Sequence, residues 1–436
     1  MDKLWLVSVN MGYGHQRSAY PLKTLAYKND VINANDYLGI PESDKKIWRQ
    51  SQAFYEAISR FKMAPLVGDF AFSMYDKLQR IANLYPKHDM SRPNIAVREM
   101  YMLLKRGWGK DLINKLSRKK MPILTTFYAP AFMAEFYDYP EEIYTVICDT
   151  DISRAWVPLN PITSRIKYFA PNERVYERLK LYGVRKKNIY LSGFPLPPDN
   201  LTAEEGVKAW KLDILAHDLR HRLANLDPNR KYFERYKVLV EKKLGSIPET
   251  GNHPLTILFS VGGAGAQKEL GVRAMASLAQ KIRNGEVKII LSAGVKGNLK
   301  DYFDEKVKSM DLGSNGGVEV LYEKDLDAYF DKFNATLRKT DILWTKPSEL
   351  SFYAGLGLPI LIAPPIGSHE DFNQRWLVKS GFGLNQENPD YMDQWLFDWL
   401  NEGYLAEAAM EGFVEGEKLG VLNIKRVVFA DKENQD

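Results

Sequence analysis

The chain has 436 residues, of which 45% are hydrophobic, and its net charge is +5. This length suffices for two or three domains with apolar cores. No run of 18 apolar residues occurs, and MDKLWLVSVN leads directly into a Gly-rich turn, which indicates a first strand and excludes a signal peptide. The single cysteine, Cys148, excludes an internal disulfide framework, so we expect a soluble cytoplasmic protein.

The positive charge is concentrated in residues 45–120, which contain 17 Lys and Arg against 6 Asp and Glu. The rest of the chain has 43 against 49 and is net acidic. Aromatic side chains recur within this segment at helical spacing, so we predict a basic, aromatic helical insertion. Its partner is an anionic membrane surface or a nucleic acid, and charge alone does not distinguish the two. Alternatively, the aromatic residues form core and the charges a solvated face.

The first predicted strand, residues 4–10, leads into MGYGHQRSAYPL, a turn that enters a helix near Arg17. Gly12 and Gly14 allow the backbone to approach a bound group closely. His15 lies at the mouth of the turn, where an imidazole can accept a proton at neutral pH. The alternative is a histidine that is hydrogen-bonded within the turn.

Two further strands, MPILTTF and IYTVICD, follow the basic segment, and the second ends in CDTDISRAW. Asp149 and Asp151 therefore lie at a strand end, where carboxylates can act as a base, orient a base, or accept hydrogen bonds from sugar hydroxyls. Turn formation and helix capping are the alternative roles.

A strand, a helix and another strand follow, before a Pro-rich exit at residues 194–198. We place the end of the first domain there, so that it spans residues 1–197. Residues 198–253 are charged and form a helical linker, with an extra helix from Lys231 onward. His217 and His221 lie four residues apart on one helical face, but no further matching ligand lies nearby, so we expect no metal site.

The second α/β domain spans residues 254–390 and begins with the strand of LTILFSVGGAGAQ. The turn after that strand exposes N–H groups that can hold a diphosphate. Its candidate binding residues are Gly262, Gly263, Gly265 and Gln267. A Lys-Ser/Thr pair is missing, which excludes a P-loop NTPase. Helices over residues 391–436 complete the chain.

The stretch from Thr345 to Asn373 predicts strand, loop, helix, strand, loop, helix, so that both loops emerge at the carboxyl edge of a parallel sheet. Ser348 can cap the first helix, which ends at residues 355–357. The loops carry side chains that suit a phosphate or a hydroxyl-rich ligand. The candidates are Lys346, Ser348, Glu349, Gly367, His369, Glu370 and Asn373.

This stretch resembles the donor-sugar motif of inverting two-Rossmann-domain (GT-B) glycosyltransferases, in the branch of diacylglycerol glucosyltransferases, monogalactosyldiacylglycerol synthases and MurG. That pattern, TKPGGLTxSEAL followed by PGQExxN, matches at Thr345, Lys346, Pro347, Leu350, Leu356, Gly367, Glu370 and Asn373. The family's GxGH matches Gly12, Gly14 and His15, and its VxTDxxxHxxW matches Asp149 and Trp156. The departures are Ser348 and Glu349 for two glycines, Ala354 for a ribose-binding glutamate, His369 for glutamine and Ser153 for histidine.

The resemblance implies two Rossmann-like domains with an interdomain cleft and a carboxyl-terminal helix that crosses back to the first domain. It implies inverting transfer of a hexosyl unit from a UDP-sugar to a hydroxyl acceptor such as diacylglycerol, without a metal or other cofactor. His15 or Asp149 would be the base. The acceptor would be bound by Gly12, Gly14, Asp151, Ser153 and Trp156. The related glycolipid synthases dock on the membrane, so we expect peripheral association with its inner face and no nucleic acid.

Two alternatives remain from the sequence. A nucleotide-sugar 2-epimerase uses the same fold and needs no acceptor. A non-catalytic descendant that binds membrane or nucleic acid would explain both the basic segment and the departures at Ser348, Glu349 and Ala354.

Overall fold

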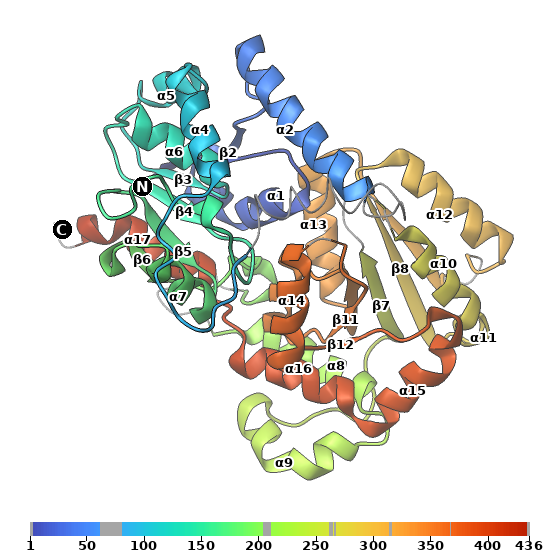
Figure 1. Cartoon of the computed structure of the whole chain (residues 1–436). Coiled ribbons are helices and arrows are strands. Elements are labelled where there is room, and N and C mark those ends of the chain that lie inside the picture. The colour runs from blue at the N-terminus through green and yellow to red at the C-terminus, as the bar shows by residue number, and fades with distance from the viewer. Residues whose placement is uncertain are drawn as a thin grey trace. The chain divides into compact units, whose positions relative to one another are not determined.

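The computed structural model describes residues 3–61, 81–203, 211–260, 265, 267–313, 316–366 and 368–433. The chain divides into two compact units, drawn together in Figure 1. The first unit contains Met1–Leu196, Ile366–Asn373 and Glu417–Asp436, and the second contains Pro197–Pro365 and Gln374–Gly416.

The first unit is built on a six-stranded sheet in the order β2-β1-β3-β4-β5-β6, in which every pair is parallel. The central strands are buried along their whole length, as expected when helices cover both faces. The strands are β1 (Leu4–Ser8), β2 (Ala26–Asn33), β3 (Ile123–Thr125), β4 (Ile143–Val146), β5 (Lys167–Ala170) and β6 (Ile189–Leu191).

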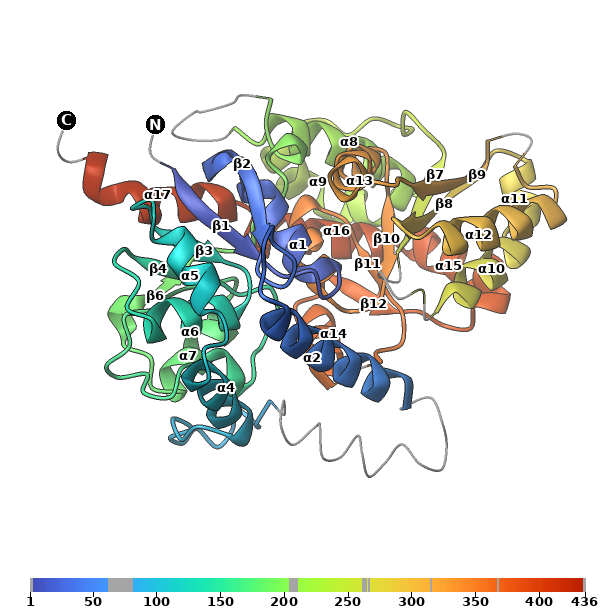
Figure 2. The same cartoon turned by 90° about the horizontal axis from the view of Figure 1, so that it is seen from above.

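Helices cover both faces of this sheet, with α5, α6 and α7 on one side and α17 on the other (Figure 2). The helical elements are α1 (Tyr13–Ala19), η1 (Tyr20–Leu25), α2 (Glu42–Phe61), α4 (Ile95–Lys105), α5 (Lys110–Leu116), α6 (Tyr128–Phe136), η2 (Arg154–Trp156), α7 (Glu173–Leu181), η3 (Lys186–Asn188) and α17 (Gly420–Glu433). In the part of the chain that the structure describes, no helix is long and apolar enough to cross a membrane.

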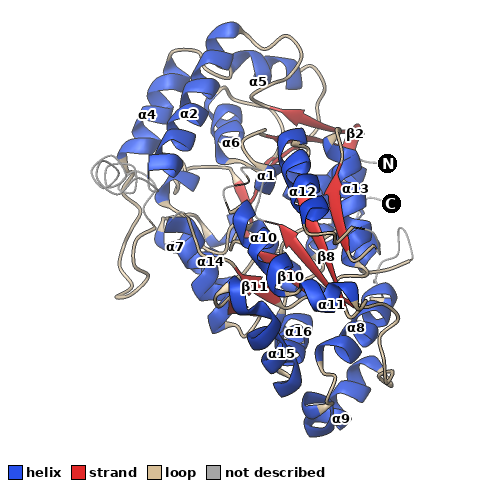
Figure 3. Ribbon diagram, turned by 90° about the vertical axis from the view of Figure 1, so that its right-hand side faces the viewer, coloured by secondary structure: helices blue, strands red, loops and turns tan. Residues whose placement is uncertain are grey.

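The second unit has its own six-stranded parallel sheet, in the order β12-β11-β10-β7-β8-β9. Figure 3 shows its strands β8, β10 and β11 beside the helices α10 and α12. The strands are β7 (Leu255–Ser260), β8 (Val287–Gly294), β9 (Val318–Tyr322), β10 (Ile342–Thr345), β11 (Ile360–Ile362) and β12 (Gly383–Asn385). The predicted pair of Rossmann-like domains is therefore confirmed.

In the second unit, α10, α11 and α12 lie on one side of the sheet and α13 on the other (Figure 2). The helical elements are η4 (Pro198–Asn200), α8 (Asp213–Leu226), α9 (Lys231–Leu244), α10 (Lys268–Ser277), α11 (Ala279–Arg283), α12 (Gly297–Ser309), α13 (Leu326–Leu337), η5 (Glu349–Leu356), η6 (Pro389–Tyr391), α15 (Met392–Glu402) and α16 (Tyr404–Glu415). Helix α14 (Ser368–Lys379) begins in the first unit and ends in the second.

The carboxyl-terminal helix returns to the first unit, as predicted. At the start of α17, a Cβ atom on Gly420 would lie 2.2 Å from the carbonyl oxygen of Phe194, so only glycine permits this close approach. One turn later, Asn423 Nδ2 donates to the carbonyl oxygen of Ser192 over 2.9 Å. The last helix therefore packs against the segment that follows β6.

Three local predictions differ from the structure. The edge strand β2 was not predicted, because its exposed, polar residues lack strict alternation and a register shift interrupts its pairing with β1. The first helix begins at Tyr13, four residues before Arg17, because Gly12 adopts φ 98° and turns the chain directly out of β1. Ser348 precedes η5 but makes no side-chain capping bond, so its predicted capping role is wrong.

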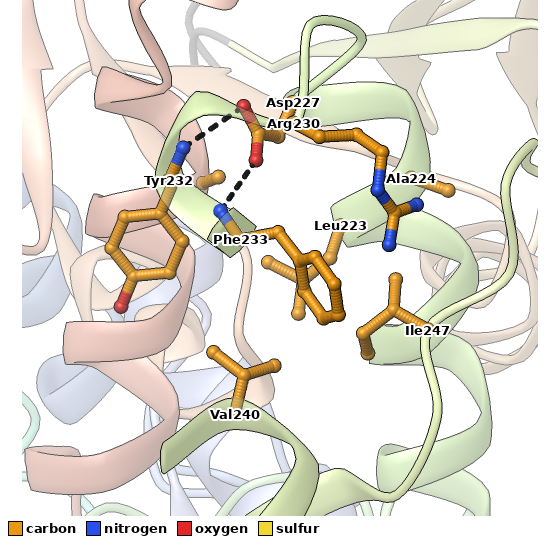
Figure 4. A pocket seen from close by; sticks show the side chains of 9 residues that line it. Leu223, Ala224, Asp227, Arg230, Tyr232, Phe233, Val240 and Ile247 are labelled. Carbon is orange, nitrogen blue, oxygen red and sulfur yellow. Dashed lines mark hydrogen bonds between the residues drawn. The ribbon is translucent and has the colours of Figure 1, made fainter. Parts of the chain in front are cut away.

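The extra helix predicted from Lys231 is α9, which packs on α8 through a tight corner (Figure 4). The carboxylate of Asp227 accepts hydrogen bonds from the backbone N–H groups of Tyr232 (3.3 Å) and Phe233 (2.8 Å). Phe233 and Val240 enter the core of the second unit. The cavity left at this corner is about 10 Å³, room for one water molecule, so the corner is structural.

A buried carboxylate lies where β10 begins. The Asp341 side chain is completely buried, and its Oδ2 accepts from the backbone N–H of Thr256 (2.8 Å) and from Asn225 Nδ2 (3.0 Å). Its Oδ1 has no hydrogen-bond partner among the described residues, and His253 Nδ1 lies 3.5 Å from Oδ2. Burial raises the pKa of Asp341 from 3.8 to about 6.

This raised pKa predicts a pH-dependent stability. Ionisation of Asp341 disfavours the folded chain, so its contribution to stability is full below pH 3.8 and is lost as the pH rises through about 6. Between pH 4 and pH 7, urea unfolding of the wild type should lose about 2 kcal/mol more than that of Asp341→Asn. The exposed Asp301→Asn serves as control and should follow the wild type. If the free energy of unfolding changed equally with pH in the wild type and in Asp341→Asn, the raised pKa of Asp341 would be contradicted.

Candidate functional site

The first sheet has a topological switch point between β1 and β3. From β1 the chain moves outward to β2 and then returns to β3 on the other side of β1. Because all strands are parallel, the turns after β1 and β3 diverge at the same carboxyl edge, which is where open α/β sheets bind ligands. His15 follows β1 and Phe127 follows β3, so the fold brings these two turns together.

The His15 imidazole lies in the first turn of α1 and is half-buried. Its Nδ1 lies 2.8 Å from the carbonyl oxygen of Thr126. A carbonyl oxygen can only accept, so Nδ1 carries the proton and donates it. In the neutral ring, Nε2 is then the nitrogen with the basic lone pair.

Aromatic side chains surround this imidazole. The Phe127 ring meets it edge to face with centroids 4.8 Å apart, and the Trp156 ring centroid lies 6.3 Å away. Tyr128 packs on Trp156 in a T-shaped contact of 5.4 Å. Aromatic rings therefore cover part of the half-buried imidazole.

The segment after β4 also reaches His15. Cys148 Sγ lies 3.3 Å from His15 Nδ1, and the next residue, Asp149, is partly exposed. The structure thus gathers His15, Trp156 and the turn that carries Asp149 at one edge of the first sheet. Gly12 is exposed at the start of α1, and Gly14 lies within its first turn.

Asp151 has a different environment from Asp149. Its carboxylate is buried and accepts from Arg178 Nε (2.8 Å) and Nη2 (2.7 Å), and the Arg178 side chain is completely buried. This bidentate pair joins the β4 turn to α7. Ser153 is buried just before η2 and makes no side-chain capping bond there.

The first half of α14 contributes further predicted residues to the first unit. Asn373 is completely buried, and its Oδ1 accepts from the backbone N–H (3.0 Å) and the hydroxyl (2.6 Å) of Thr150. Glu370 Oε2 accepts from the backbone N–H of Ile366 over 2.7 Å. His369 is half-buried in the first turn of the helix. Asn373 therefore supports the turn that carries Asp149.

The second sheet has its switch point between β7 and β10. Gly265 and Gln267 follow β7, and Lys346, Ser348 and Glu349 follow β10, all of them partly exposed. Gln267 Nε2 donates to the carbonyl oxygen of Pro364 over 2.8 Å, which joins the turn after β7 to the loop after β11. The predicted residues Gly262, Gly263 and Gly367 lie outside the described residues.

Ala354 is buried against helix α16 within the second unit. A Cβ atom on Gly412 of α16 would lie 2.4 Å from the carbonyl oxygen of Ala354, which is itself buried. That Cβ would also lie 3.3 Å from the Cβ of Ala354, so the side chain at position 354 faces α16. Glu349 is an acidic residue five positions earlier, which begins η5 and is more exposed than Ala354.

The sequence analysis did not identify the residues that form hydrogen bonds or contacts with the predicted site residues. Thr126 and Thr150 act partly through backbone atoms, which no residue pattern reveals. Cys148 carried a signal, because it directly precedes Asp149 at a strand end. Arg178 lies three residues after the buried Val175 and directly before the buried Leu179, so its place on the inner face of α7 was readable.

The histidine pair of α8 belongs to the second unit. The His217 and His221 rings are 5.0 Å apart, and burial lowers the pKa of His221. Within the described residues, no group of three or more His, Cys, Asp or Glu side chains could hold a metal ion.

A family described as a domain of unknown function (DUF6938) matches residues 248–316. No curated protein matches the sequence. Solved structures similar to the chain include the S. aureus MnaA–UDP co-structure (12% identity, TM-score 0.49, 100% of this chain and 97% of that chain covered). A putative UDP-N-acetylglucosamine 2-epimerase from Listeria monocytogenes (12%, 0.47, 100% and 98%) and Acinetobacter baumannii MurG (12%, 0.48, 99% and 99%) are also similar.

The Asp151–Arg178 pair makes a prediction about stability. Asp151→Asn leaves the buried guanidinium without its counter-charge, so denaturant unfolding should show a loss of about 3 kcal/mol. Glu142→Gln is the control, because Glu142 pairs with Lys167 at the surface over 2.9 Å and its loss should change stability by less than about 1 kcal/mol. Unchanged stability of Asp151→Asn would show that Asp151 does not support the fold.

Proposed function

We propose that this protein transfers a hexosyl unit from a UDP-sugar to a hydroxyl acceptor with inversion at the anomeric carbon. One observation carries the proposal: each unit has the predicted residues at its own topological switch point. In the first unit His15 lies at the switch point and the turn of Asp149, after the neighbouring β4, reaches it through Cys148; in the second unit the residues lie in the turns after β7 and β10. A fold with two such edges suits a reaction between two substrates.

The acceptor would be activated in the first unit. His15 Nε2 takes the proton of the acceptor hydroxyl as its oxygen attacks the anomeric carbon and the bond to the nucleotide diphosphate breaks. The bond from Nδ1 to the Thr126 carbonyl oxygen supports this role, because it leaves Nε2 as the basic nitrogen. Asp149 is the second candidate base, and Trp156, with Gly12, Gly14 and Ser153, would complete the acceptor site.

The donor would bind in the second unit. Backbone N–H groups of the turn at 262–267 and the ammonium group of Lys346 would stabilise the departing diphosphate. Ser348 and Glu349 would hydrogen-bond the nucleoside or the sugar, and Glu349 takes the place of the family glutamate at the buried position 354. His369 would contact sugar hydroxyls. Glu370 and Asn373 would shape the start of α14, because their side-chain oxygens accept hydrogen bonds from Ile366 and Thr150.

We further propose a lipid acceptor at the inner face of an anionic membrane. Helix α4 supports this part, because Ile95 (62% exposed) and Met102 (52% exposed) lie among exposed cationic side chains. Exposed apolar residues beside Lys and Arg suit a headgroup interface. The cations are Arg98, Lys105 and Arg106.

Product analysis tests the transfer. With UDP-hexoses and diacylglycerol, the wild type should form an inverted glycoside only when the acceptor is present. His15→Gln should lower kcat/KM by about 10²–10⁴-fold, the usual effect of losing a general base. His88→Gln is the control and should retain turnover, because His88 is exposed and its Nδ1 lies 2.7 Å from the nearby Pro86 carbonyl oxygen.

Other outcomes would assign a different function. Epimerised UDP-sugar from donor alone would identify a 2-epimerase. Thermal stabilisation by UDP-sugars should reach about 2.7 kcal/mol at a hundredfold excess over the Kd. Its absence for every nucleotide sugar would reject both enzymes and favour the non-catalytic binding protein.

Vesicle co-sedimentation tests the lipid surface. The triple variant Arg98→Gln, Lys105→Gln, Arg106→Gln should lower binding to phosphatidylserine vesicles by about a hundredfold, since each basic residue contributes about 1 kcal/mol. A matched triple on α9 removes equal charge beside the exposed Val238 and Leu239 and should bind normally. It consists of Lys237→Gln, Lys242→Gln and Lys243→Gln. Equal losses in both triples would reject α4 as the docking surface.

A further inference from the structure

We propose that Cys148 is a positioning residue for His15, with its Sγ acting as the second acceptor of the Nδ1 proton. The consequence for catalysis rests on the proposed function, in which His15 is the base. The contact itself is independent of that function. Nδ1 lies 2.8 Å from the Thr126 carbonyl oxygen and 3.3 Å from Cys148 Sγ.

The direction of these hydrogen bonds follows from the chemistry of the three groups. The carbonyl oxygen cannot donate, and a ring nitrogen in contact with it at 2.8 Å must carry a proton. The Cys148 sulfur therefore meets an N–H and not a lone pair, so it accepts. The Nδ1 proton is shared between two acceptors, a three-centre arrangement that proteins use commonly.

The two acceptors are fixed by neighbouring strands. Thr126 follows β3, where its N–H donates to the Val7 carbonyl oxygen (3.1 Å) and its hydroxyl to Ser8 Oγ (2.9 Å). Cys148 follows β4, where the preceding Ile147 N–H donates to the Phe169 carbonyl oxygen over 3.1 Å. Both acceptor residues are buried. Both residues that hold the imidazole are therefore anchored by hydrogen bonds to strands of the sheet.

Two hydrogen-bond acceptors restrict the orientation of the imidazole ring more than one acceptor does. A single acceptor fixes a distance but lets the ring pivot about the N–H···O line, whereas a second acceptor on another strand restricts that pivot. The edge-to-face contact with Phe127 restrains the ring plane from a third direction. Together they hold the Nδ1–H tautomer and direct Nε2, which matters because misplacement of a reacting group slows catalysis steeply.

Imidazole ¹⁵N spectra test the role of Cys148 directly. Wild type, Cys148→Ser and Cys148→Ala would be compared at a pH where the ring is neutral, with His15→Gln to assign the signals. The wild type should show a protonated Nδ1 and an unprotonated Nε2. Cys148→Ser retains an acceptor and should keep this pattern, whereas Cys148→Ala should show an increased fraction of the Nε2–H form.

Kinetics supply the second readout. Cys148→Ala should lower kcat about tenfold with an unchanged KM for the donor, well short of the loss expected for His15→Gln, and Cys148→Ser should restore most of it. Ser192→Ala is the matched control: Ser192 is equally buried and follows β6, three strands away from β3, and its hydroxyl donates to the Gly193 carbonyl oxygen over 2.8 Å. It should leave both the spectrum and kcat unchanged.

The outcomes separate the two proposals. An Nε2–H tautomer in the wild type, or identical spectra for wild type and Cys148→Ala, would overturn the positioning role even if transfer is observed. Tautomer changes without any transferase activity would support the positioning role and reject the proposed function. If Cys148→Ala does not fold, the wild-type and Cys148→Ser spectra decide, because a loss of Nδ1 protonation in either would overturn the proposal.

Discussion

Both sheets are entirely parallel, and this constraint organises everything else in the molecule. A parallel strand sends its carboxyl end to the same edge as its neighbours, so residues far apart in sequence meet there without any dedicated contact. His15, Thr126 and Cys148 come from three separate parts of the chain and lie within hydrogen-bonding distance for this reason. In each sheet the strand order reverses once, and the turns on either side of that switch point diverge.

The fold was largely predictable because buried parallel strands are short apolar runs that alternate with amphipathic helices. The edge strand β2 escaped prediction because it has one paired side and exposed polar residues. The turns after the strands were also predictable, since glycines and polar residues mark them. What each side chain does in those turns was not, because that depends on partners contributed by other strands.

Asp149 and Asp151 illustrate this limit. The two carboxylates are separated by one residue and have the same chemistry, so the pattern assigned them similar roles. In the folded chain Asp149 remains partly exposed, whereas Asp151 is buried on the guanidinium of Arg178. Asn373 shows the same effect, because its register in a donor-site motif did not reveal that its oxygen holds Thr150. The long-range partner decides the role in each case.

The return of the carboxyl-terminal helix has a consequence for biosynthesis. All six strands of the first sheet are translated by residue 191, yet α17, which packs against the segment after β6, is translated only from residue 420 onward. Domains usually fold in order as they leave the ribosome. Here the amino-terminal unit lacks α17 until the second unit, which ends at Gly416, has been translated, so during synthesis the surface that α17 covers is exposed.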